Sequence, residues 1–244
     1  MIPLSQLDEP VWEEDIDDTD DVLPVLHACN AELPVAQRLL ATHRLLERFL
    51  RSEANLGGAQ LQSLVPALLD MAIEADRLPQ IAVKVLWCIA GTPRGVAALE
   101  RHDAIPTMFG ILRGNSDVLL AAAVAQFLER MCRSGDALAA HLRKASSAQL
   151  LLRSLWRWRH CLEIVTSLLQ VFTLATRIPC YRSIVAAELT LADNTCLGLP
   201  QILWGLAQDE QDAVSEEETI AWARTRTTAA SLAREWDGIA RALG

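Results

Sequence analysis

A repeat with a period of 42 residues constrains the fold of this chain more than any other feature of the sequence. When residues 85–113 are laid without gaps on residues 127–155, apolar positions coincide along both segments. Turn residues coincide as well, because the Thr-Pro pair at 92–93 falls on the Ser-Gly pair at 134–135. A period of this length is typical of proteins built from stacked units, each of which buries its apolar face only against its neighbours.

Turn residues divide each unit into a long helix, a short helix and a second long helix, with the first unit less regular. No alternation with a period of two residues competes with this pattern, so no strand is predicted. The predicted helices are residues 34–51 and 59–75 in the first unit, 79–91, 93–101 and 104–113 in the second, 117–132, 136–144 and 147–158 in the third, and 160–176, 181–189 and 198–207 in the fourth.

Three prolines occur in the same local context. Pro66, Pro106 and Pro200 each follow an apolar residue and precede an apolar run. Proline has no backbone N–H and is tolerated in the first turn of a helix, where that N–H would have no partner within the helix. Each of the three is therefore predicted to mark the start of a helix.

The composition agrees with long helices that have polar outer faces. Apolar residues make up 51% of the chain and aromatic residues only 5%, which favours an all-α fold. No run of about 18 apolar residues is present, so insertion into a membrane is not expected. We expect a cytoplasmic location instead. Nine acids and no base lie between Asp8 and Asp21; the remaining 22 of the 31 acids balance the 22 bases. The net charge of −9 thus belongs to an N-terminal arm.

The C-terminal region is predicted to close the stack. Residues 209–218 contain no base, and Ser215 followed by Glu218 is typical of a capped helix start. Leu232, Trp236 and Ile239 then recur on one helical face. We interpret this helix as a cap on the last unit, with a coiled-coil contact to a partner as the alternative. The predicted organisation is an acidic arm (1–21), a repeat domain (22–207) and an acidic linker with a capping helix (208–244).

No pattern of residues predicts chemistry. The five histidines are scattered without the spacing of a metal site, and no glycine-rich loop follows a strand as a phosphate site requires. The six cysteines form no C-x-x-C pair and mostly lie in apolar helical patterns. We therefore predict no catalytic, metal-binding or cofactor-binding residue, and expect that the chain is not an enzyme.

The run from residue 89 to 123, IAGTPRGVAALERHDAIPTMFGILRGNSDVLLAAA, resembles an armadillo repeat. The resemblance implies a right-handed α-solenoid of about four repeats with a concave binding surface; HEAT-like helix pairs are the nearest alternative. Armadillo proteins that hold basic peptides carry Trp and, four residues later, Asn on the helix that lines the groove. Lys84 and Cys88 occupy these positions here, followed in the next repeat by Gln126 and Arg130, and Trp87 lies one position away. Binding of nuclear-import cargo is therefore disfavoured.

A basic stretch is the candidate binding surface. Residues 129–160 contain seven bases and two acids, and Trp alternates with Arg at 156–159. Arg and Trp are typical anchors of interfaces; the alternative is a solvated helical edge with one Trp in the core. Since the body is neutral and the arm acidic, an acidic protein segment fits better than nucleic acid. The candidate partner-binding residues are Lys84, Arg130, Arg133, Arg153, Trp156, Arg157, Trp158, Arg159 and, in the arm, Trp12.

Three functions remain open. The first is a protein-binding scaffold or adaptor within a larger assembly, for instance a cytoskeletal, ciliary or trafficking complex. The second is a nucleotide-exchange co-chaperone of Hsp70, because the order of repeats, acidic linker and terminal helix is similar to that of the armadillo exchange factors. The third is an enzyme or small-ligand protein. The arm is either a solubilising tail or a segment that lies along a basic groove, its own or that of a partner.

Overall fold

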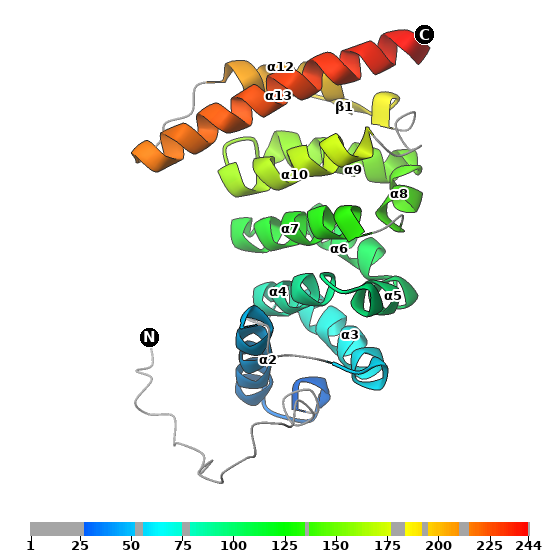
Figure 1. Ribbon diagram of the computed structural model, residues 1–244, viewed down its shortest axis with the longest axis vertical. Coiled ribbons are helices and arrows are strands. Elements are labelled where there is room, and N and C mark those ends of the chain that lie inside the picture. Colours follow the sequence, from blue (N-terminus) through cyan, green and yellow to red (C-terminus); the bar gives the residue numbers. More distant parts are fainter. Residues whose placement is uncertain are drawn as a thin grey trace.

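The chain folds into two layers of helices that stack along the long axis of the molecule (Figure 1). The computed structural model describes residues 27–51, 56–74, 79–134, 137–176, 184–191, 195–209 and 215–243. Each helix contacts the next helix of its own layer. The first layer consists of α2 (Val35–Leu50), α4 (Pro79–Ile89), α7 (Val118–Ser134), α10 (Leu162–Ala175) and α13 (Glu216–Leu243), and the second of α3 (Gly58–Ile73), α6 (Ala104–Gly114), α9 (Ala145–Arg157) and α12 (Leu199–Gln208). The predicted all-α fold is confirmed.

Two short helices cross from the first layer to the second. They are α5 (Pro93–Arg101), between α4 and α6, and α8 (Ala137–Leu142), between α7 and α9. The order long, short, long thus occurs as the sequence predicts. Within the described part of the chain, no helix is long and apolar enough to cross a membrane.

The core follows from the apolar pattern of each helix. In α7 all five residues from Leu120 to Val124 are buried, as are Phe127, Leu128 and Met131, because α4 and α10 flank this helix in its layer and α6 packs on its other side. The alanines among them allow these neighbours to approach closely. Each large apolar side chain that is removed from water contributes about 1.5–3 kcal/mol to folding.

The helices α4 and α7 run in the same direction. The Gln80 side-chain amide donates to Asp117 Oδ2 (2.8 Å) and joins the beginnings of α4 and α7. The Ser134 hydroxyl donates to the Ala90 carbonyl (3.1 Å) and joins their ends. Figure 1 shows α10 and α13 in the same orientation. The neighbouring helices α4 and α7, and likewise α10 and α13, are therefore parallel.

Asp117 begins α7 with a side-chain cap. Its Oδ1 accepts hydrogen bonds from the backbone N–H groups of Leu119 (2.8 Å) and Leu120 (3.3 Å), which have no partner within the helix. Desolvation raises the pKa of this carboxyl, but the bonds from Leu119, Gln80 and Leu120 together outweigh it and lower the pKa below its usual value. The cap is therefore charged at neutral pH.

The Gly-Thr-Pro turn between α4 and α5 depends on a tight approach. Thr92 Oγ1 accepts a hydrogen bond from the Gly95 N–H (3.0 Å), and Pro93 occupies the first helical position. A Cβ on Gly95 would overlap the carbonyl oxygen of Ile89 at the end of α4. Only glycine lets α5 turn this closely against α4.

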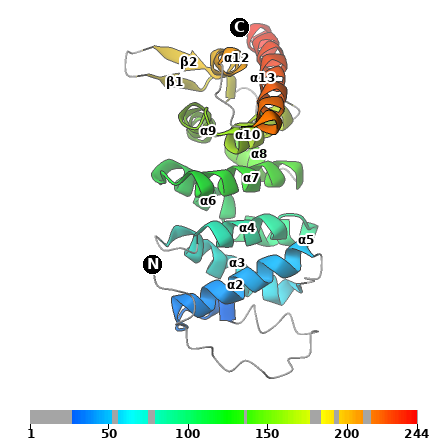
Figure 2. The ribbon, with the colours of Figure 1, turned by 90° about the vertical axis from the view of Figure 1, so that its left-hand side faces the viewer.

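The helix predicted at 181–189 is wrong at its end, and its first three residues lie outside the described residues. Residues 184–185 are helical, but β1 (Glu188–Thr190) pairs antiparallel with β2 (Cys196–Gly198), Leu189 opposite Leu197. Figure 2 shows the two strands beside α9, on the opposite side from α13, and the Gln149 side chain donates to the Glu188 carbonyl (3.1 Å). Pairing with a later segment overrides the local helix preference of this stretch.

The prediction that each proline marks a helix start is wrong for Pro66. Pro106 and Pro200 lie in the first turns of α6 and α12, but Pro66 lies in the middle of α3. An interior proline costs about 3 kcal/mol because it removes one backbone hydrogen bond and crowds the preceding turn. Burial of Val65, Leu68 and other side chains on both sides of Pro66 outweighs this cost.

The last helix, α13, packs over the helices α10 and α12. Ser215 Oγ accepts a hydrogen bond from the Glu218 N–H (3.1 Å) at its start. Leu232 and Trp236 are buried, and α13 packs against α10 and α12. The predicted apolar seam therefore faces the preceding unit.

Candidate partner-binding surface

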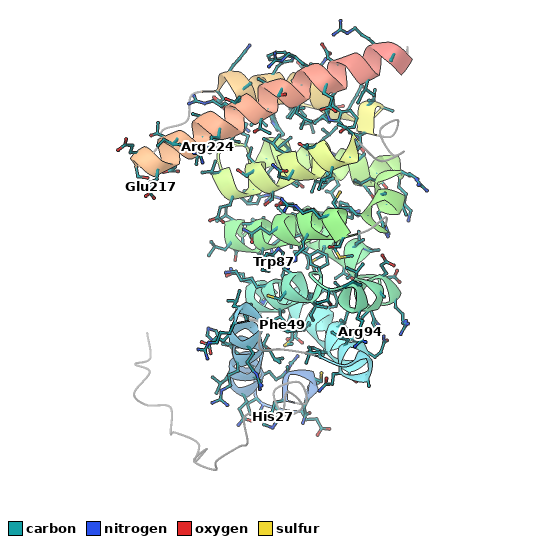
Figure 3. All side chains as sticks on the ribbon, in the orientation of Figure 1. His27, Phe49, Trp87, Arg94, Glu217 and Arg224 are labelled. Carbon is teal, nitrogen blue, oxygen red and sulfur yellow. The ribbon has the colours of Figure 1, made fainter. Side chains whose placement is uncertain are left out.

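An arginine of α7 stacks on a tryptophan of α4. The guanidinium carbon of Arg130 lies 4.1 Å from the centre of the Trp87 ring, and both side chains are half-buried. Trp87 lies where α4 faces α7 (Figure 3), and Lys84 is exposed three residues earlier on α4. Stacking fixes the plane of the guanidinium and leaves its N–H edges for a planar anion. We call Lys84, Trp87 and Arg130 the stack site.

Gly91 provides the room that this arginine occupies. A Cβ at this position would overlap Arg130 Nη2 and lie 2.9 Å from Arg130 Cζ. The backbone of Gly91 is not in the left-handed region. Glycine is therefore required here because it has no side chain, not because of its backbone conformation. No carboxylate of the described residues forms an ion pair with Arg130. The guanidinium is held in place by an aromatic ring and a glycine, with its charge available to an anion.

Cys88 supplies a neutral neighbour to the stack site. Burial raises the pKa of its thiol, and the positive charge of Arg130 lowers it by a smaller amount. The net pKa lies above the usual value, so the thiol is protonated at neutral pH and keeps the site cationic.

The other predicted residues lie elsewhere. Arg133 is exposed and bound to Glu129 on its own helix (2.6 Å), and Arg153 is exposed on α9. Arg157 stacks on Trp158 (4.9 Å) and Arg159 on Trp156 (4.6 Å), all within the turn from α9 to α10. Trp12 lies outside the described residues. Lys84 therefore lies one helical turn from the Trp87 ring on which Arg130 stacks, and residues 156–159 form a separate corner at the end of α9.

Residues of this corner stabilise the C-terminal end of α9. Arg159 Nη1 donates to the Trp156 carbonyl (3.1 Å), one of the last carbonyls of the helix, and a cation is favoured at a helix C-terminus. The indole N–H of Trp158 is buried and makes no hydrogen bond with the described residues. The contacts of these arginines are with their immediate chain neighbours, so the corner has a structural explanation without a partner.

Trp87 and Gly91 are the residues that the sequence-based prediction left out. The signal for them was present, because the 42-residue offset sets Cys88 on Arg130 and leaves Trp87 one position away. What the sequence did not show is that the long Arg130 side chain crosses to the neighbouring ring.

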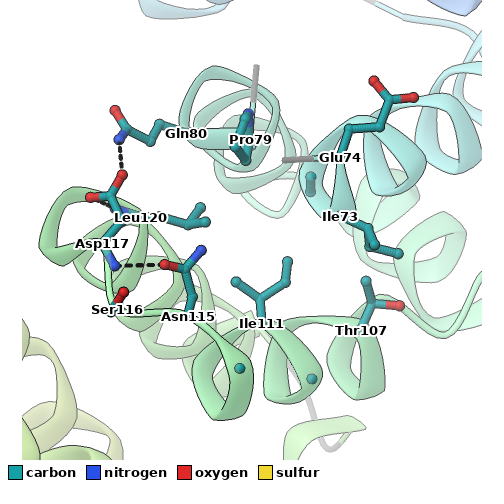
Figure 4. A pocket seen from close by; sticks show the side chains of 13 residues that line it. Ile73, Glu74, Pro79, Gln80, Thr107, Ile111, Asn115, Ser116, Asp117 and Leu120 are labelled. Atoms are coloured by element: carbon teal, nitrogen blue, oxygen red, sulfur yellow. Dashed lines mark hydrogen bonds between the residues drawn. The ribbon is translucent and has the colours of Figure 1, made fainter. Parts of the chain in front are cut away.

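A cavity of about 960 Å³ opens beside the loop between α6 and α7 (Figure 4). Its carboxylates already have partners, because Glu74 pairs with buried Arg38 (3.6 Å) and Asp117 caps α7. Among the residues with described positions, no group of three or more His, Cys, Asp or Glu side chains could hold a metal ion.

Comparison with known proteins gives the fold alone. The sequence matches no model of a protein family, and no curated protein matches it. The structure is similar to the crystal structure of an engineered protein from the Northeast Structural Genomics Consortium, with a TM-score of 0.50 and 12% sequence identity. The match covers 87% of this chain and 96% of that one. The helical architecture of this chain is thus also found in an engineered protein.

Proposed function

We propose that this chain is a non-catalytic scaffold or adaptor that binds an acidic protein segment through the stack site. The observation that carries the proposal is the Arg130–Trp87 stack between two helices that are far apart in sequence. Its guanidinium is pre-oriented and has no carboxylate partner among the described residues, and the Trp87 ring beneath it lies one helical turn from the exposed Lys84. Such an arrangement binds carboxylates with charge-assisted hydrogen bonds.

We further propose that the two layers form an armadillo-like α-solenoid of about four repeats with a C-terminal capping helix. The repeated order of long, short and long helices supports this, as does the parallel course of the neighbouring helices α4 and α7. In the armadillo arrangement the first layer would line the concave face, which is the face that holds partners. A member of a larger cytoplasmic assembly, such as a cytoskeletal or ciliary complex, is the setting that fits a fold used for binding.

The test is binding of a fluorescent peptide rich in Asp and Glu, followed by anisotropy. The native chain is compared with an arm-neutral chain, in which the nine acids of residues 8–21 are replaced by the corresponding amides so that the arm cannot compete. A peptide of the same length with Asn and Gln instead controls for nonspecific association. Binding of the acidic peptide alone, weakened by salt, supports the proposal. Absence of binding to both chains contradicts it.

Two variants locate the site. Arg130→Gln removes the guanidinium and is expected to weaken binding about 10- to 100-fold, the equivalent of about 1.5–3 kcal/mol for a charge-assisted hydrogen bond. Gly91→Ala removes no charge but displaces Arg130 from Trp87, so it should weaken binding as well. Arg153→Gln on α9 is the matched control, because it removes one exposed charge outside the stack site. Equal effects of Arg130→Gln and Arg153→Gln would show that only net charge matters.

A further inference from the structure

Building on the proposed function, we infer that the acidic arm of this chain is the first occupant of the stack site. In the absence of a partner, residues 8–21 dock in cis across α2, α4 and α7, and a partner has to displace them. Three observations support this: the charge of these helices, the exposed apolar side chains of α2 and the length of the arm.

Positive charge is concentrated on α2, α4 and α7. Two acids accompany these bases, Glu47 and Glu129, and both already pair with side chains on their own helices. By contrast, α10 carries the acid Glu163 and no base. The bases on α2, α4 and α7 are Arg38, Arg44, Arg48, Lys84, Arg130 and Arg133; all but buried Arg38 reach the surface. The nine acids of the arm are complementary to this surface.

The two ends of the stack differ in how they are covered. At the C-terminal end, α13 closes the stack and buries Trp236. At the other end, α2 leaves Val35, Leu40 and Leu50 exposed, the last to 64%. Terminal units of a helical stack need a cover with a polar outer face. The arm has the composition of such a cover, since Val11, Trp12 and Ile16 interrupt its acids.

The arm is long enough to span the surface. Its acids lie 6 to 19 residues before His27, which Figure 3 shows beside α2. At about 3.4 Å per residue they extend up to about 65 Å from that point. The helix α2 is about 24 Å long at 1.5 Å per residue, and α7 lies two helix spacings of about 10 Å beyond it. The acids can therefore cover α2 and still reach Arg130.

Photo-crosslinking of the full chain tests the docking directly. A p-benzoylphenylalanine replaces Ile16, the protein is irradiated, and crosslinked peptides are identified by mass spectrometry. Docking predicts crosslinks within one chain to α2, α4 or α7, with a yield independent of protein concentration. Lys84→Gln with Arg130→Gln should reduce that yield at least several-fold, whereas the matched pair Arg153→Gln with Arg157→Gln should not. Crosslinks to α9 or α12, or crosslinks only between chains, overturn the inference.

The peptide assay separates this inference from the proposed function. A tethered segment competes at an effective concentration in the millimolar range, so the arm-neutral chain should bind the acidic peptide at least tenfold more tightly than the native chain. Equal binding to both chains leaves the stack site in place as a binding site and refutes the cis docking. Absence of binding to both chains refutes the proposed function itself.

Discussion

The Gly95→Ala substitution tests the close packing between α4 and α5. The new Cβ would overlap the Ile89 carbonyl oxygen and lie 2.8 Å from both the carbonyl carbon and Cγ2 of the same residue. The obstacle is backbone at the end of a helix, so it cannot move aside as a flexible side chain would. Either α5 shifts away from α4 or the Thr92 cap is lost.

The expected magnitude comes from two opposing effects. Replacing glycine by alanine inside a helix stabilises it by about 1 kcal/mol. Overpacking costs typically about 1–3 kcal/mol, and we expect the upper end because the neighbour is a backbone carbonyl. Gly95→Ala should therefore lower the free energy of unfolding by about 2 kcal/mol, a balance of these two terms.

Gly110→Ala in α6 is the matched control. Its Cβ would meet nothing within 4 Å, and the residue is exposed. Both substitutions restrict the unfolded chain in the same way, so the difference between them reports the contact with Ile89. Gly110→Ala should be more stable than the parent by about 1 kcal/mol in urea unfolding followed by circular dichroism. If Gly95→Ala proves as stable as Gly110→Ala, the argument from close packing is refuted.

Three further substitutions follow from the described contacts. Thr92→Ala removes the cap of α5 and should cost about 1 kcal/mol of unfolding free energy, and Thr92→Ser should restore most of it. Asp117→Ala should destabilise the protein at neutral pH, because the pKa of Asp117 is lowered in the folded state. The stability that this carboxylate contributes is present above its unfolded pKa and is lost as the pH falls through its folded pKa. The free energies of unfolding of the parent and Asp117→Ala should therefore become equal at acidic pH. Trp236→Ala should cost about 3–5 kcal/mol because this side chain is fully buried, whereas Trp204→Ala, at a position 37% exposed, should change stability by less than about 0.5 kcal/mol in the same urea assay.

The sequence predicted those parts of the fold whose signals are local. The short helix α5 begins and ends at the predicted residues. Its start depends only on neighbouring residues, because Thr92 caps the helix through the Gly95 N–H and Pro93 occupies the first helical position. The strand β1 escaped prediction because its partner residues come later in the chain, and three residues with mixed preferences carry no period of their own. The prediction that Pro66 starts a helix was wrong for a similar reason, since the burial that keeps α3 continuous arises only after the helices pack.

In the candidate site, too, the sequence showed local patterns but not the contacts between residues distant in sequence. Arg157 and Arg159 were predicted to bind a partner because they alternate with tryptophans in sequence. Successive residues of a helix point in different directions, however, and do not form one face. The pair that the structure brings together across two helices, Trp87 and Arg130, is 43 residues apart. The repeat offset almost identifies it, and only the packed helices show which side chains of neighbouring units meet.

The parallel course of α4 beside α7, and of α10 beside α13, has an electrostatic consequence. Each helix carries a macrodipole, positive at its start and negative at its end, and parallel neighbours place like poles side by side, where they repel. Acids stand at the starts, such as Asp117 of α7 and Glu163 of α10, and bases near the ends, such as Arg133 of α7 and Arg241 of α13. These charges offset a repulsion that an antiparallel bundle would cancel by geometry. Charged residues of the matching sign at its own ends therefore stabilise a helix in such a layer.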